Sequence, residues 1–203
     1  MSIHRGQLAR PLPPLPAGAL PDGPVAYLDI ETTGLKPAEA QVTLVGLVYA
    51  EGGVRRLEQH FVASPDEEAE VLRTVGERLE QFAGVITYNG TTFDLPFLKR
   101  RAKLFGLTWP DVENYDLLAV ARAWKQEYGH LPDCRLQTVM AHFRVGREDA
   151  TSGLEMIDAY YRWLQAGRPA DRDLILAHNA DDLLLLPDLV PHLTAAPGAV
   201  RLA

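Results

Sequence analysis

One segment constrains the fold of this chain more than any other: residues 27–34, YLDIETTG, an apolar run that ends in two carboxylates. In an extended strand every second side chain points to the same side. The segment therefore predicts a strand with Leu28 and Ile30 in the core and with Asp29 and Glu31 together on the other side. Two neighbouring carboxylates repel each other unless a hard cation that prefers oxygen ligands, such as Mg²⁺ or Mn²⁺, lies between them. The alternative is a solvated strand end that leads into a turn.

Length and composition predict one globular domain. The chain has 203 residues, 47% of them hydrophobic, and a chain of this size buries roughly 70% of the surface that it exposes when unfolded. Cys134 is the only cysteine, so we expect no internal disulfide, no structural zinc site and a cytoplasmic location. No apolar run approaches the roughly 20 residues that span a bilayer, and the N-terminus has no apolar signal core, so we expect no membrane association.

The formal net charge of −7 argues against a protein that coats nucleic acid without specificity, because such proteins normally carry a strongly basic face. The negative charge does not argue against an enzyme that holds only the end of a nucleic-acid chain. A local basic cluster can be either a solvated helix face or a contact surface for phosphates. The cluster consists of Lys99, Arg100, Arg101 and Lys103.

The order of apolar runs predicts an α/β fold with a mixed five-strand sheet flanked by helices. Residues 1–24 are expected to form a Pro-rich arm that packs loosely or not at all, 25–195 the folded domain, and 196–203 a tail. The expected strands are 25–30, 42–49, 54–62, 85–88 and 112–115, with a hairpin between the second and the third. The first expected helix begins at the capping signals of residues 64–66 and ends near Gly84, and the others are 93–105, 117–127, 136–143, 154–164 and 171–186, with a break at 146–153.

Asp94 lies in the segment NGTTFD, directly after the short strand expected at 85–88. Loops at the ends of strands in α/β sheets usually carry ligand sites. The alternative is that Asp94 caps the N-terminus of the helix that follows, and the two roles are compatible.

His178 and Asp182 are four residues apart on the last expected helix, so their side chains occupy one face, which Asp181 does not share. The helix continues into an apolar run, where an acid and an imidazole would be costly unless they served a partner, a metal or a polar cleft. Taken alone, a histidine is more often a surface or hydrogen-bonded structural residue.

Together these motifs resemble, in order and spacing, those of the four-acid (DEDD) 3′ to 5′ exonucleases, which have a ribonuclease H-like fold. The matching residues are Asp29 and Glu31 in DIETTG, Asn89, Phe93 and Asp94 in NGTTFD, and His178 and Asp182 in HNADD. Residues 135–140, 147–153 and 178–186 are also similar to the YprB-type predicted exonucleases, which are related to the proofreading domains of family B DNA polymerases.

The resemblance implies hydrolysis at the 3′ end of single-stranded DNA or RNA, with release of nucleoside 5′-monophosphates. It implies two divalent ions, Mg²⁺ or Mn²⁺, held by Asp29, Glu31, Asp94 and Asp182. It further implies that His178 takes or directs the proton of the attacking water, a task that suits the ordinary imidazole pKa of about 6.5. The sequence gives no indication of a protein partner.

The resemblance also implies residues that hold the terminal nucleotide: Thr32, Thr33, Gly34, Asn89 and Phe93. Core packing for Phe93 and turn chemistry for Asn89 are the alternatives.

One spacing departs from the family pattern. In one subclass a Tyr precedes the last Asp by four positions, and in the other a His precedes it by five. Here His178 precedes Asp182 by four, so the residue that handles the proton is less firmly indicated than the four acids.

Two other functions fit parts of the pattern. A catalytically weak or inactive protein that binds nucleic-acid ends could keep the same fold, although all four acids are present. A metal-dependent phosphatase could use Asp29 as a nucleophile, but that chemistry usually needs a second Asp nearby as an acid, and Glu31 followed by TTG fits it poorly.

Overall fold

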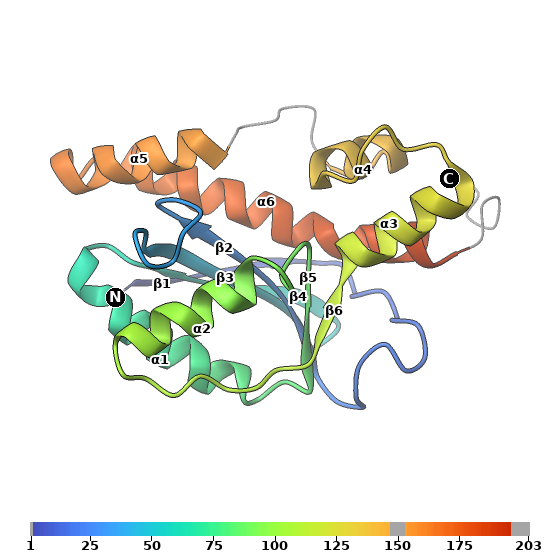
Figure 1. The fold of residues 1–203 in the computed structure, drawn as a ribbon, viewed down its shortest axis with the longest axis horizontal. Helices are drawn as coiled ribbons and strands as arrows, with labels where there is room; N and C mark the ends of the chain where they lie inside the picture. Colours follow the sequence, from blue (N-terminus) through green and yellow to red (C-terminus); the bar gives the residue numbers. More distant parts are fainter. Residues whose placement is uncertain (1, 147–152, 196–203) are drawn as a thin grey trace.

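A mixed six-stranded sheet forms the centre of the computed structural model, which describes residues 2–146 and 153–195 (Figure 1). The strands are β1 (Ser2–Leu8), β2 (Val25–Thr32), β3 (Val42–Glu51), β4 (Val54–Phe61), β5 (Gly84–Thr87) and β6 (Asn114–Asp116). Their order across the sheet is β1-β4-β3-β2-β5-β6. The first four strands pair antiparallel, while β5 and β6 run parallel to β2. The α/β fold class is confirmed, but the sheet has one strand more than we expected.

Helices cover both faces of this sheet (Figure 1). One face carries α1 (Glu68–Leu79) and α2 (Asp94–Leu104), which pack on alternate residues of β2 such as Leu28 and Ile30; the short 3₁₀ helix η1 (Pro65–Glu67) precedes α1. The other face, which includes Tyr27, packs against α3 (Leu117–Tyr128), α4 (Leu136–Phe143), α5 (Gly153–Ala166) and α6 (Pro169–Thr194). The alternation predicted for β2 is thus confirmed. No helix of the described residues is long and apolar enough to cross a membrane.

The N-terminal segment corrects our prediction of a loosely packed arm. Residues 2–8 form the edge strand β1, antiparallel to β4 from Ser2 opposite Phe61 to Leu8 opposite Arg55. Beyond β1, Leu12, Leu15 and Leu20 pack on the core that lies beneath α3 and α6. The fold therefore starts before Val25. Because backbone hydrogen bonds hold β1 more than apolar side chains do, its weak apolar pattern gave little signal.

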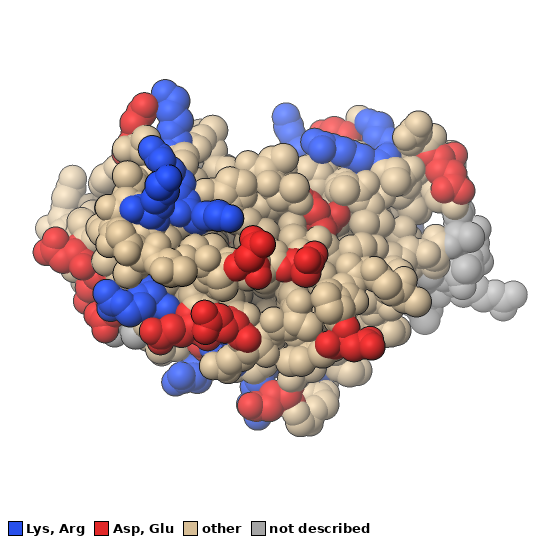
Figure 2. Space-filling model, turned by 60° about the horizontal axis from the view of Figure 1, so that its bottom comes forward, with Lys and Arg blue, Asp and Glu red and all other residues tan. Residues whose placement is uncertain are grey.

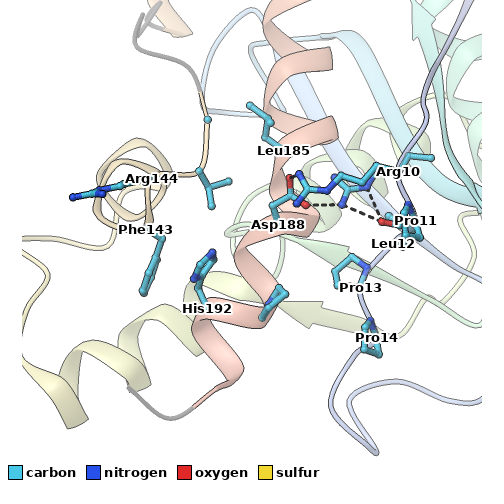
Figure 3. Close-up of a pocket in the computed structure, with 14 residues that line it drawn as sticks. Arg10, Pro11, Leu12, Pro13, Pro14, Phe143, Arg144, Leu185, Asp188 and His192 are labelled. Atoms are coloured by element: carbon cyan, nitrogen blue, oxygen red, sulfur yellow. Dashed lines mark hydrogen bonds and ion pairs between the residues drawn. The ribbon is translucent and has the colours of Figure 1, made fainter. Parts of the chain in front are cut away.

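A buried ion pair fixes the segment that follows β1 (Figure 3). Arg55 of β4 is only 1% exposed, and its Nη2 lies 2.5 Å from Oδ1 of Asp188 in α6. The same guanidinium donates hydrogen bonds to the carbonyl oxygens of Pro11, at 3.2 Å, and Leu184, at 2.6 Å. Arg10 pairs with the other oxygen of Asp188 from the surface. A buried cation is tolerated here because its donors are satisfied.

The last helix is longer than the pattern predicted. We expected it to end at residue 186, but α6 continues through Pro187 and Pro191 to Thr194. Each proline lacks a backbone donor, so the carbonyls of Leu183 and Pro187, four residues earlier, lose their usual intrahelical hydrogen bond. Both Leu189 and Val190 are fully buried, so packing holds the last turns in place. The segment 147–152, part of our predicted break, and the tail 196–203 lie outside the described residues.

Candidate active site

Acidic side chains gather where β2, β5 and β6 end. These strands are parallel, so their carboxyl ends meet at one edge of the sheet. Asp29 and Glu31 belong to the end of β2, Asp94 to the start of α2 after β5, and Asp116 to the end of β6. The structure therefore brings together residues from three separate parts of the sequence.

Helix α6 supplies the remaining two predicted residues on the face of β2 that carries Asp29 and Glu31. The Nε2 atom of His178 lies 3.8 Å from Oδ2 of Asp182, one turn along α6, and 3.9 Å from Oε1 of Glu31. His178 is only 9% exposed, so its imidazole stands between the two carboxylates inside the site. The expected shared face of His178 and Asp182 is confirmed.

The position of α6 depends on Gly46 of β3, which pairs with Asp29. A Cβ atom on Gly46 would lie 2.2 Å from Oδ1 of Asn179 and 2.4 Å from a methyl carbon of Leu183, so only glycine lets the helix come this close. The close approach allows Nδ2 of Asn179 to donate to Oδ2 of Asp29 at 2.8 Å. Gln59 of β4 donates in turn to Oδ1 of Asn179 at 2.9 Å. This relay fixes the orientation of the Asp29 carboxylate.

Asp94 is anchored differently. It is the first residue of α2, and its Oδ1 accepts a hydrogen bond from the backbone N–H of Ile30 at 3.2 Å. The bond ties the start of α2 to the end of β2. Phe93, not Asp94, occupies the N-cap position of α2, so the capping role that we considered for Asp94 is wrong.

Burial and crowding make the charged forms of these acids unfavourable. Burial is the largest cause that raises the pKa of Asp29 well above its usual range, and the carboxylates of Asp94, Glu31 and Asp182 raise it further. Burial, followed by Asp182 and Asp94, raises the pKa of Glu31 to about 8. Burial also raises the pKa of Asp94 to about 7, against two backbone hydrogen bonds that lower it. The four acids therefore act on one another as a single electrostatic unit.

This donor set fits divalent cations in its chemistry. Four carboxylates offer the hard oxygen ligands that Mg²⁺ and Mn²⁺ prefer, and a cation would relieve the repulsion that raises their pKa values. Within the described residues no three His, Cys, Asp or Glu side chains are grouped closely enough to hold one ion as they stand. Rotation of the side chains would have to bring the ligands closer.

The residues predicted to hold a terminal nucleotide make local contacts. The hydroxyl of Thr32 donates to the carbonyl oxygen of Gly34 at 2.9 Å, and the hydroxyl of Thr33 accepts from the backbone N–H of Gln41 at 3.0 Å. Asn89 adopts a left-handed conformation (φ 72°), and its side chain accepts from Thr92. These bonds shape the two loops that border the acids.

Phe93 packs against the core and against the ring of Phe97, with ring centroids 5.5 Å apart. Turn chemistry for Asn89 and core packing for Phe93 are thus present, and a nucleotide-binding role for these residues stays a prediction.

Three residues of the site escaped the sequence reasoning: Asn179, Gly46 and Asp116. Asp116 accepts from the backbone N–H groups of Asn89, at 2.8 Å, and Thr91, at 3.0 Å, and so holds the loop before Asp94. It also accepts from Leu118 at 3.0 Å and caps α3. Its place directly after a predicted strand was a usable signal. Asn179 stands inside the HNADD motif, but only the contact with Gly46 reveals its role.

In the basic cluster on α2, Arg101 is engaged within the fold, while Arg100 and Lys103 are exposed. Arg101 makes a two-pronged ion pair with Glu68, which is 1% exposed, and donates to the carbonyl oxygen of Pro37. Lys99 lies 3.8 Å from Asp111 on the surface. On the face in Figure 2, basic side chains form separate groups between acidic ones and not one continuous basic surface.

The site thus consists of carboxylates at the parallel edge of an α/β sheet together with an acid and a histidine from the last helix. A family model described as RNase_H superfamily matches residues 26–194. The chain belongs to the RNase_H superfamily.

Individual proteins extend this relationship. The chain is 27% identical over 174 residues to the uncharacterized protein YprB of Bacillus subtilis (strain 168), covering 83% of this chain and 41% of that protein. The family B DNA polymerase of Pyrobaculum calidifontis has a similar structure, with a TM-score of 0.65 and 18% identity over 94% of this chain and 29% of that one.

Exonuclease I of E. coli, solved in complex with a dT13 oligonucleotide, gives a TM-score of 0.52 with 16% identity over 77% of this chain and 44% of that one. The chain thus spans less than half the length of each of these three proteins.

Proposed function

We propose that this chain is a metal-dependent 3′ to 5′ exonuclease that acts on single-stranded nucleic acid and releases nucleoside 5′-monophosphates. The observation that carries the proposal is the meeting of Asp29, Glu31, Asp94 and Asp182 at one edge of the sheet, where the other three carboxylates raise the pKa of Asp29. Membership of the RNase_H superfamily and the likeness to a structure of exonuclease I with a bound oligonucleotide support it.

In this proposal the four carboxylates would hold two divalent ions, Mg²⁺ or Mn²⁺. The ions, when bound, supply a lowered pKa for the attacking water and neutralise the charge that builds on the phosphate. Asp29 is suited to bind an ion, because the hydrogen bond from Asn179 engages only one of its two carboxylate oxygens. Asp94 holds its place through the backbone of Ile30, which ties it to the strand that carries Asp29.

His178 is suited to accept or direct the proton of the attacking water. Its Nε2 atom faces Glu31 and Asp182, two of the acids, at 3.9 and 3.8 Å. An imidazole in its neutral form can accept a proton from a water held beside these acids. The neighbouring loops, through Thr32–Gly34 on one side and Asn89 with Phe93 on the other, would receive the terminal base and sugar.

A degradation ladder tests the proposal. The protein is incubated with 5′-labelled linear single-stranded DNA or RNA in Mg²⁺, Mn²⁺ or a chelator, and a circular single strand serves as the control. A ladder that shortens from the 3′ end, requires metal and leaves the circle intact is the expected result. Cuts within the circle, or cleavage in the chelator, would refute the assignment. Tight binding of the 3′ end with no cleavage in any metal would favour an end-binding protein on this fold.

A further inference from the structure

A cavity of about 690 Å³ opens beside the acidic site. Its walls come from Tyr88 and Asn89, which follow β5, and from Arg122 and Lys125 of α3. Residues 133–136, which lead into α4, complete them. Neither Arg122 nor Lys125 belongs to the acidic site or to the loops that border it. The cavity is therefore a separate feature that adjoins the site along the β5–β6 side of the sheet.

Asn89 and Asp116 fix the cavity to the acidic site. The backbone N–H of Asn89, in the cavity wall, donates to the carboxylate of Asp116, and the same carboxylate oxygen accepts from Leu118 in the first turn of α3. The loop of Asn89 then leads directly into Asp94. Arg122 and Lys125 follow Asp116 by six and nine residues, so they lie about 9 and 14 Å further along the helix axis. A single nucleic-acid strand whose 3′ end lies at the acids can therefore continue into the cavity.

The cavity carries an excess of positive charge in a chain whose net charge is −7. Three cations, Arg122, Lys125 and Arg135, line it with one acid, Asp133. Within the described residues neither Arg122 nor Lys125 forms an ion pair, although Nζ of Lys125 donates to the carbonyl oxygen of Pro132 at 2.7 Å. Asp133 is engaged with Arg135, since its Oδ1 accepts from the backbone N–H of Arg135 at 2.9 Å and its Oδ2 lies 4.0 Å from Nε of the same residue, which is exposed.

We propose that this cavity binds the backbone phosphates of the nucleotides that precede the 3′-terminal residue of a single strand. The inference rests on the proposed function, because it assigns the path of the same substrate. Arg and Lys side chains spaced along a helix are suited to successive phosphates, and such contacts bind without reading the base. The basic cluster of α2 is the alternative path: Arg101 is held by Glu68 and Lys99 lies beside Asp111, whereas Arg100 and Lys103 are exposed.

Salt dependence of binding tests the proposal. The affinity of the full chain for 5′-fluorescent dT12 is measured by anisotropy over a series of salt concentrations, with Ca²⁺ in place of Mg²⁺. Each phosphate contact on a single strand contributes about 0.7 to the slope of log K against log salt, so the triple variant Arg122→Gln/Lys125→Gln/Arg135→Gln should lose about 2 from that slope. Its Kd should rise about 10-fold or more at low salt. The control Arg73→Gln, an exposed cation on α1 across the sheet, should change neither value.

Substrate length separates this inference from the proposed function. The nitrophenyl ester of thymidine 5′-monophosphate presents a phosphodiester with no preceding phosphates. The ratio of kcat/KM for dT12 to kcat/KM for the ester should fall about 10-fold or more in the triple variant. An unchanged ratio would overturn the cavity assignment while leaving the exonuclease proposal standing. If the wild-type protein cleaves neither substrate, the exonuclease proposal is refuted. If the triple variant then still loses the salt-dependent binding of dT12 that the wild type shows, the cavity assignment is supported.

Cys134 gives a readout that does not depend on catalysis. It is the only cysteine of the chain and lines the cavity, so its reaction with a thiol reagent should slow several-fold when dT12 is bound. Wild-type affinity and salt slope in the triple variant, together with an unprotected Cys134, would overturn the inference. So would protection of Cys134 by a poly-glutamate peptide and none by dT12, since the cavity would then favour an acidic protein segment.

Discussion

Asp29 is under electrostatic stress, because burial and three neighbouring carboxylates all disfavour its charged form. The single bond from Asn179 offsets only part of this stress. A site arranged in this way is destabilising in the folded protein unless positive charge is supplied, and stress of this kind clusters at functional sites. At the scale of single residues, the crowded carboxylates therefore lower the stability of the metal-free folded protein and form a site that attracts cations.

Replacement of Asp29 by asparagine tests this loss of stability. In metal-free protein the raised pKa values of Glu31, about 8, and Asp94, about 7, mean that the folded state holds protons that the unfolded state has released. Stability should therefore fall as the pH rises from about 5 to about 8. Asp29→Asn should raise the Tm at pH 8 by about 3 °C or more and flatten this pH dependence, measured by thermal unfolding in a chelator.

The same variant should lose nuclease activity by at least about 100-fold, more than the loss of an outer partner of a metal ligand typically costs. Glu77→Gln, an exposed acid on α1, is the matched control and should change neither property. A lower metal-free Tm for Asp29→Asn would indicate a structural carboxylate instead.

His178 carries the second prediction. His178→Ala should lower turnover by about 10²- to 10⁴-fold, the usual effect of a positioned acid or base, and should flatten the acidic limb of the rate–pH profile. His178→Tyr should keep more activity, because a phenol at this spacing can orient water by hydrogen bonding. Near-normal turnover of His178→Ala across the pH range, beside an inactive Asp182→Ala, would mean that the histidine is a bystander on α6.

At the scale of elements, the contact between α6 and β3 builds the site. Gly46 lets the helix approach the strand, and the approach allows Asn179 to reach Asp29. Leu183, one turn further along α6, is fully buried against the same strand and keeps the helix at this depth. The acids of β2 and those of α6 therefore share a site only while this contact holds.

Gly46→Ala should separate the two elements. The added Cβ would meet Asn179 and Leu183 at 2.2 and 2.4 Å, so α6 or Asn179 must move, and the variant should lose about 1–3 kcal/mol of stability and much of its activity. Denaturant unfolding and nuclease assays measure the two losses. Gly76→Ala, inside α1, is the control. The atom nearest to its added Cβ would be a side-chain carbon of Pro110 at 3.5 Å, an ordinary contact, so stability should stay level or rise. Equal effects of both substitutions would contradict the packing argument.

At the scale of the whole molecule, the N-terminal segment is part of the fold. Strand β1 pairs with β4 and is itself the edge strand of the sheet. The buried pair of Arg55 and Asp188 then joins that segment, the sheet and α6 at one point, because Arg55 also donates to the carbonyls of Pro11 and Leu184. The segment after β1 and the end of α6 are held by the same guanidinium.

Breaking this pair should destabilise the whole chain. Asp188→Asn would leave Arg55 as a buried cation without a counter-charge, which typically costs about 3–5 kcal/mol. Arg10→Gln removes the half-exposed partner of the same carboxylate and should cost less than about 1 kcal/mol. Both free energies come from denaturant unfolding. Similar losses for the two variants would show that the buried pair has no special role.

The sequence predicted the parts of the fold and site that depend on local periodicity. Alternation in β2 placed Asp29 and Glu31 on one side, and the four-residue spacing placed His178 and Asp182 on one face of α6. Contacts between distant residues left no such pattern. Gly46 and Asn179 come into contact only after the sheet and the helix have packed together. Strand β1 is held by backbone hydrogen bonds to β4, which the pattern of its side chains does not predict.

The most direct test of the central claim is a Mn²⁺ titration of the release of the labelled 3′-terminal nucleotide from dT12, by wild-type protein, Asp29→Asn and Asp182→Asn. The account predicts that the wild type releases labelled nucleoside 5′-monophosphate in a saturable, metal-dependent manner that a chelator stops. Both variants should be slower by about 100-fold or more at every Mn²⁺ concentration. Release by the wild type in the chelator, or wild-type rates in either variant, would contradict the claim that these carboxylates form one metal-dependent site.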